Sequence, residues 1–213
     1  INSLTSLMID DTSIADFTGL EDFTGLTILQ LKNNANVTKI DISKNTELIN
    51  LIVNNSALVS LDVTKNTKLV DLYCNGNQLT SLDVSKNTAL VSLDFGNNKV
   101  SAIDVSNNTL LTNLNCYSNQ LITLDLSQNT QLTNLNCQNN SLTTVNLRNG
   151  NNTNLRTVEN NSGKNVKKGV VVYPIGIFGF QNNDPALVIL VDNKSYSDTN
   201  WMAYKDASAV YLE

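Results

Sequence analysis

The chain has 213 residues, of which 41% are hydrophobic and 15% are charged, so it can bury a sizeable core and does not have a disordered composition. Its net charge is −5, and the acidic excess lies before Lys32, which leaves no basic face and argues against nucleic acid as a partner. Histidine is absent, which removes the commonest general base and metal ligand, and no apolar run reaches the ~18 residues that a membrane span needs.

Residues 1–28 form the first expected element, an irregular capping turn. The segment "LMI" at 7 is followed by the similar segment "LQL" at 29. Between them, Phe17, Leu20 and Phe23 stand where later turns carry a strand. A repeated structure exposes its core at both ends, so we expect these side chains to close the N-terminal end.

From residue 40 the chain repeats at a constant interval without a slip. One series of segments starts at Ile40, Leu61, Leu82, Ile103, Leu124 and Val145, and a second series, such as "LYC" at 72 and "LDF" at 93, lies between them. Both series alternate apolar and polar residues, the signature of a short strand with one buried face. We therefore predict a mostly β solenoid of about seven turns, with two parallel sheets on opposite sides.

Asparagine recurs at the bends between the predicted strands. We expect these amides to satisfy backbone groups at the corners and to bond to their copies in neighbouring turns, with Thr12 and Ser56 as polar substitutes. The first ladder consists of Asn45, Asn66, Asn87, Asn108 and Asn129, and the second ladder consists of Asn34, Asn77, Asn98, Asn119 and Asn140.

The repeat slips near residue 150, where Gly150 replaces an asparagine of the first ladder. We assign residues 1–161 to the solenoid and residues 162–213 to a β-rich C-terminal cap. Strands are expected in "VVVYPIGIFGF" and "ALVILVDN", followed by an aromatic stretch containing Trp201, Tyr204 and Tyr211. A separate small sorting or binding module is the alternative for this region.

The segment "LTNLNCYSNQLITLDLSQNTQ" over 111–131 resembles the leucine-rich repeat, in the bacterial 21-residue subclass with nested half-repeats called IRREKO. The resemblance covers about residues 4–160. "SIADFTGLEDFTGLTILQL" resembles the first repeats of internalin-like proteins, and "VDNKSYSDTNWMAYKDA" resembles the C-terminal flank of the subclass, with one extra residue before the final Asp. This resemblance implies a right-handed solenoid and a secreted or surface-displayed bacterial protein.

One outer surface is predicted to be monotonous. Its aspartate column is followed by hydroxyl residues and often by lysine, which we interpret as a solvated polar face, with a row of calcium sites as the alternative. The column consists of Asp41, Asp62, Asp83, Asp104 and Asp125. Cys116 and Cys137 take the inward position that Phe95 holds in another turn, so we expect buried free thiols rather than a disulfide.

The other outer surface varies from turn to turn, and packing does not explain its variation. Tyrosines on a flat sheet suit a recognition surface, although singly exposed apolar residues are also ordinary. The candidate binding residues, called the variable face below, are Gln30, Ile52, Tyr73, Asn75, Asp94, Asn115, Tyr117, Asn136 and Gln138.

No group of residues breaks the repeat as a catalytic or metal site would, so we expect no enzyme activity, metal or cofactor. The sequence favours a protein-interaction module, monomeric and located outside the cell or at a bacterial cell surface. A passive scaffold or spacer, and a glycan-binding adhesin, are the alternatives.

Overall fold

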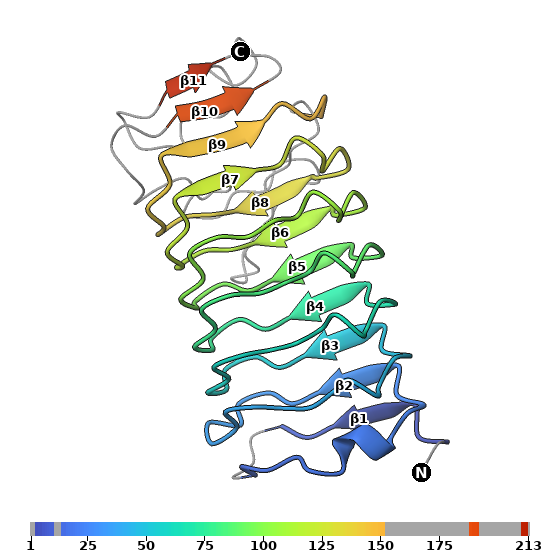
Figure 1. Ribbon diagram of the computed structural model, residues 1–213. Helices are drawn as coiled ribbons and strands as arrows, with labels where there is room; N and C mark the ends of the chain where they lie inside the picture. The colour runs from blue at the N-terminus through green and yellow to red at the C-terminus, as the bar shows by residue number, and fades with distance from the viewer. Residues whose placement is uncertain (1–2, 11–13, 152–187, 192–209, 213) are drawn as a thin grey trace, which may run out of the picture.

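The computed structural model describes residues 3–10, 14–151, 188–191 and 210–212. These residues contain short parallel strands, one 3-10 turn, η1 (Leu20–Asp22), and no α-helix. Figure 1 shows the strands stacked in a solenoid from the N-terminal to the C-terminal end. The strands are β1 (Ser6–Met8), β2 (Ile28–Gln30), β3 (Asn50–Ile52), β4 (Asp71–Tyr73), β5 (Ser92–Asp94), β6 (Asn113–Asn115), β7 (Thr123–Asp125), β8 (Asn134–Asn136), β9 (Thr144–Leu147), β10 (Val188–Val191) and β11 (Val210–Leu212).

Sheet A is the larger of the two sheets and carries the variable face. Its order is β1-β2-β3-β4-β5-β6-β8, and its register pairs Leu7 with Leu29, Leu29 with Leu51 and Leu51 with Leu72. The middle leucine of each of its strands from β2 onward is at most 2% exposed, while its two neighbours point outward. The predicted alternation is therefore confirmed, as is the repeat interval, which is longer by one residue in the first two steps.

Sheet B is shorter than predicted. Its order is β11-β10-β9-β7, and in Figure 1 its arrows run opposite to those of sheet A, on the other side of the turns. The strands predicted at 40–42, 61–63, 82–84 and 103–105 are wrong, because these segments form no strand. Their apolar residues nevertheless point inward, since Val63, Val84 and Val105 are at most 1% exposed.

The reason for the missing strands lies in how the turns are joined on that side. Direct backbone bonds connect the turns just before these segments, as from Gln78 N to Leu58 O at 2.9 Å. Just after them, an asparagine amide bridges the turns, as from Asn87 Nδ2 to Asn66 O at 2.9 Å. Between these two points, the segments 61–63 and 82–84 make no backbone bond to each other, so alternation fixed the burial of these residues without giving a β ladder.

The first ladder is confirmed in position, but its bonding differs from the prediction. Each amide donates to two backbone carbonyls of the preceding turn and not to the side chain of its copy. Asn108 Nδ2 lies 3.0 Å from Val84 O and 2.8 Å from Asn87 O. The Oδ1 atoms of this ladder are buried and have no partner among the described residues.

The second ladder uses both ends of its amides. Asn119 Nδ2 donates to Phe95 O at 3.0 Å and to Cys116 O at 3.1 Å, while its Oδ1 accepts the backbone N–H of Val100 at 2.9 Å. Asn77, Asn98 and Asn140 repeat this pattern. Ser56 does not substitute for an asparagine, because its buried hydroxyl makes no hydrogen bond to any described residue, and Thr12 lies outside the described residues.

Directly before the second ladder, each turn passes through a left-handed backbone conformation that the sequence analysis did not predict. The φ angles are positive at residues that tolerate this region, because glycine lacks a Cβ and asparagine can bond locally. They lie between 51° and 70° at Asn33, Asn55, Gly76, Asn97, Ser118 and Asn139. The recurring Asn-Asn, Gly-Asn and Ser-Asn pairs are the sequence signal from which this conformation could have been predicted.

The ends of the solenoid are closed partly as expected. Leu20 in η1 is buried and Phe17 and Phe23 pack against the core, although β1 already supplies a strand within the predicted capping turn. At the other end Gly150 does not interrupt the first ladder, because Asn149 and Asn151 donate to Asn129 O and Leu132 O. The strand predicted in "ALVILVDN" is present as β10, which pairs with β9, whereas the predicted strand over 170–180 and the motif after Val191 lie outside the described residues.

Candidate functional site

The structure brings the variable face together on sheet A. Six of its residues end successive strands and are direct cross-strand neighbours in one row: Gln30, Ile52, Tyr73, Asp94, Asn115 and Asn136. Asn75, Tyr117 and Gln138 lie two residues beyond the row in their own turns. All nine residues are half-buried, so they are less exposed than the sequence suggested.

Tyr117 lies against the backbone of the preceding turn. A Cβ atom added at Gly96 would stand 2.1 Å from Tyr117 Cε1 and 2.3 Å from Tyr117 Cδ1, so the ring occupies the space that a side chain would need. Gly96 and Tyr117 share one position of the repeat in successive turns. The glycine therefore leaves the space in which this tyrosine ring lies.

Asp94 is the most unusual residue of the row, because its carboxylate is half-buried within a sheet surface. Its Oδ1 accepts the Gly96 backbone N–H at 2.9 Å, and its Oδ2 accepts Asn115 Nδ2 at 3.0 Å. Burial raises the pKa of Asp94 above its usual value, and these two hydrogen bonds oppose the rise without cancelling it. Burial, and secondarily the charge of Asp94, also raises the pKa of Tyr117.

Polar contacts between neighbouring turns also hold Gln30 and other outward side chains of sheet A in place. Gln30 Nε2 donates to Asp10 Oδ2 at 2.5 Å, and Asp10 Oδ1 accepts the Lys32 backbone N–H at 2.9 Å. Farther along, Asn50 Nδ2 lies 3.3 Å from Asp71 Oδ2. These bonds orient the side chains before any partner binds, which lowers the entropic cost of binding.

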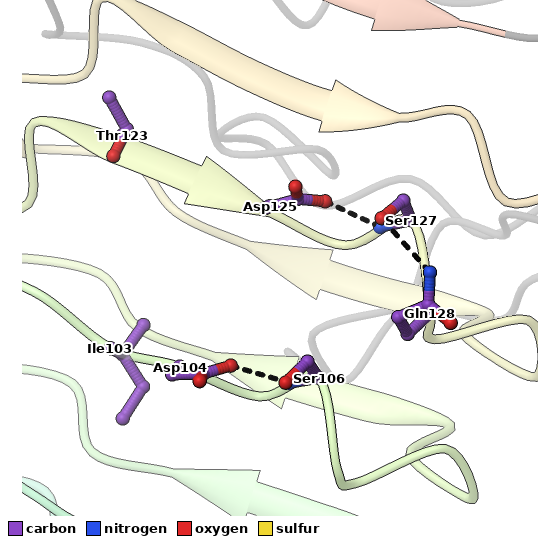
Figure 2. Close-up of a pocket in the computed structure, with 7 residues that line it drawn as sticks. All are labelled: Ile103, Asp104, Ser106, Thr123, Asp125, Ser127 and Gln128. Atoms are coloured by element: carbon purple, nitrogen blue, oxygen red, sulfur yellow. Dashed lines mark hydrogen bonds between the residues drawn. The ribbon is translucent and has the colours of Figure 1, made fainter.

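The aspartate column on the opposite side has a structural role that the sequence analysis did not assign. Each Oδ1 accepts the backbone N–H of the residue two positions on, at 2.8–2.9 Å, and so caps the following turn. Figure 2 shows this contact between Asp104 and Ser106 and between Asp125 and Ser127, beside a pocket also lined by Ile103, Thr123 and Gln128. Within the described ranges, no three acidic or cysteine side chains are grouped to hold a metal ion.

The turn-capping bonds also act on the charge of these aspartates. The Ser85 backbone N–H, followed by the Ser85 hydroxyl, lowers the pKa of Asp83 below its usual value. Asp41 and Asp104 are affected in the same way by Ser43 and Ser106. The column is thus ionised at neutral pH and recurs because every turn needs its cap.

The cysteines lie inside the solenoid. Cys74, Cys116 and Cys137 are free and 0% exposed, which confirms the buried thiols expected at Cys116 and Cys137. Burial raises the pKa of all three above the usual thiol value. They act as small apolar residues of the core rather than as reactive groups.

The described residues contain no helix whose length and apolar character would let it span a bilayer. No protein-family model matches the sequence, and comparison with curated proteins gives no match.

Solved structures of leucine-rich repeat proteins do match. The Leptospira interrogans LRR protein LIC12759 aligns with a TM-score of 0.69 and 21% identity, over 100% of this chain and 55% of that one. Internalin C2 from Listeria monocytogenes aligns with a TM-score of 0.56 and 22% identity, over 66% of this chain and 64% of that one.

A third match is the functional domain of InlJ from Listeria monocytogenes, described as including a cysteine ladder. It is 33% identical, with a TM-score of 0.45, over 68% of this chain and 44% of that one. The chain spans about half the length of the InlJ and Leptospira structures. The chain therefore has the leucine-rich repeat fold, with repeats similar to those of bacterial internalins.

Proposed function

We propose that this chain is a non-enzymatic protein-interaction module of a secreted or surface-exposed bacterial protein, and that it binds its partner through the variable face of sheet A. One observation carries the proposal. The outward residues of sheet A change from turn to turn along one row of hydrogen-bonded strands. The aspartate column on the opposite side repeats because each aspartate caps its own turn.

The chemistry of the variable face suits protein binding. Tyr73 and Tyr117 offer broad apolar area with few rotatable bonds, and the amides beside them offer donors and acceptors at fixed positions. The internalin-type matches are consistent with a place outside the cell, and we extend that location to this chain as part of the proposal.

The test uses a double variant, Tyr73→Ala with Tyr117→Ala. Immobilised wild-type chain is exposed to a preparation of cell-surface proteins, and each captured protein is then purified and its Kd is measured by biolayer interferometry. Loss of two half-buried rings should raise the Kd of a true partner tenfold or more, which corresponds to a loss of about 1.4 kcal/mol or more of binding free energy.

A matched control places two substitutions on the opposite side. Thr67→Ala with Thr88→Ala changes exposed residues next to the first ladder and should leave the Kd unchanged. A partner whose affinity drops equally in the control, or not at all in the tyrosine variant, contradicts the proposal. Binding only to a glycan array would support the adhesin alternative, and no ligand in either assay would support a passive scaffold.

A further inference from the structure

The outward side of sheet A carries acidic charge and no base at its centre. Along the outward positions of β3, β4, β5, β6 and β8, the charged residues are Asp71 and Asp94. The ion pair found in the described part of the chain, Lys68 with Glu47 at 2.6 Å, is made by residues outside the strands. Asp94 is therefore a half-buried carboxylate whose counter-ion does not come from this sheet.

The protein holds the Asp94 carboxylate in one orientation. Gly96 N–H and Asn115 Nδ2 each bind a different oxygen of Asp94, at 2.9 Å and 3.0 Å. A carboxylate has about four acceptor positions, so each oxygen can still accept a further donor. The two bonds leave Asp94 fixed and incompletely satisfied.

Tyrosines stand in the turns on both sides of Asp94. Tyr73 is the direct cross-strand neighbour of Asp94, at a strand spacing of about 4.8 Å. Tyr117 lies on the other side, with its ring against Gly96, the residue whose N–H binds Asp94. A cation bound by Asp94 would therefore have a tyrosine on each side, and aromatic faces attract positive charge within about 6 Å.

We propose that Asp94, Tyr73 and Tyr117 form a binding site for one guanidinium group, supplied by an arginine side chain of the protein partner. A guanidinium is planar, donates two parallel hydrogen bonds to a carboxylate and stacks on aromatic rings, so it matches all three residues at once. A metal ion would need more converging ligands than this face provides, and an anionic group would be repelled by Asp94 and Asp71.

This inference rests on the proposed function for the identity of the partner, but it can be tested without one. The probe is N-acetyl-arginine amide, titrated into the ¹⁵N-labelled chain while the backbone amide signals of residues 94–96 and 115–117 are followed by NMR. N-acetyl-citrulline amide is the uncharged control of the same shape, and N-acetyl-lysine amide tests whether a planar cation is needed.

We expect saturable shifts with the arginine amide, with an affinity at least tenfold tighter than that for the citrulline amide and weaker at high salt. Asp94→Asn keeps the size of the side chain and should reduce the affinity for the arginine amide about tenfold. Asp71→Asn removes the other charge at the outward positions of β3 to β8 in sheet A and should change that affinity less than twofold. Melting temperatures of both variants show whether each is folded.

Two results would overturn the guanidinium site. One is equal binding of the arginine and citrulline amides, or unchanged binding in Asp94→Asn. The other is binding of the lysine amide as tightly as the arginine amide, which would show that the planar group is not recognised.

The two proposals fail in different ways. If the affinity of a captured partner falls in the tyrosine variant but is unchanged in Asp94→Asn, the interaction face stands and the guanidinium site is rejected. Binding of a glycan that stacks on the tyrosines would give the same result. If the arginine amide binds while captured partners ignore both tyrosines, the cation site stands and the proposed function is rejected.

Discussion

Removal of one asparagine from each ladder should have very different effects on stability, although the same atoms are deleted. Asn108→Ala in the first ladder removes two hydrogen bonds from Nδ2, to Val84 O and Asn87 O. Both carbonyls keep another donor, since Val84 O accepts Asn87 N at 3.0 Å and Asn87 O accepts Leu90 N at 3.1 Å. The two lost bonds are worth about 1 kcal/mol each, and the substitution also removes the buried Oδ1, whose lack of a partner destabilises the wild type. We therefore expect the free energy of unfolding to fall by about 1–2 kcal/mol.

Asn119→Ala in the second ladder should cost more. Its Oδ1 accepts the backbone N–H of the buried Val100, and no other described atom accepts that N–H once the amide is gone. An orphaned buried N–H adds about 1–3 kcal/mol to the loss of the amide's own bonds, so we expect about 3–5 kcal/mol in total. The loss of packing is matched between the two variants, which makes their difference of about 2 kcal/mol the informative quantity.

The measurement is urea unfolding followed by far-UV circular dichroism, with the m-value compared between variants. Asn107→Ala, at an exposed asparagine next to Asn108, is the control and should lie within about 0.5 kcal/mol of the wild type. Equal costs for Asn108→Ala and Asn119→Ala, or a larger cost for Asn108→Ala, would refute the assignment of different roles to the two ladders.

Titratable groups give three further predictions. The pKa values of the turn-capping aspartates are lowered in the folded state; for Asp83 the largest cause is the hydrogen bond from the Ser85 backbone N–H. The charges of these aspartates therefore stabilise the fold fully above the unfolded-state pKa of about 3.9, and this stabilisation is lost as the pH falls through the folded-state pKa values. Urea unfolding at pH 7 and pH 3 should show a lower free energy of unfolding at pH 3. Because burial raises the pKa of Asp94, its ionised form disfavours folding, so Asp94→Asn should raise the melting temperature at pH 7 but not at a pH where Asp94 is protonated. The buried thiols should stay unreactive toward Ellman's reagent in native buffer and react after unfolding in urea: Cys74, Cys116 and Cys137.

The sequence predicts the fold well because the repeat supplies the same information in every turn. A leucine that recurs at a constant interval within an alternating segment can only face a shared interior, and the burial of Leu72, Leu93 and Leu114 agrees. Alternation specifies which face is buried but not whether the backbones of neighbouring turns bond directly. For that reason the segments at 61–63 and 82–84 were wrongly predicted as strands.

The candidate site is predictable only in part from the sequence. The period and the alternation place Tyr73, Asp94 and Asn115 on one outer row, and the register of β4, β5 and β6 agrees. The contact of Tyr117 with Gly96 depends on a large residue standing one turn after a small one, which is visible only when successive turns are compared position by position. The orientation of Asp94 depends on hydrogen bonds, which no spacing reveals.

The acidic residues of the two outer surfaces have opposite energetic effects. An aspartate of the column, such as Asp83, has its pKa lowered by bonds within its own turn, so its charge stabilises the fold. Asp94 has its pKa raised by burial, so its charge is held at the expense of stability. A solenoid built only for stability would place an asparagine there, as it does in the next two turns at Asn115 and Asn136. A carboxylate kept at that position is explained if a positively charged group from outside the chain completes it.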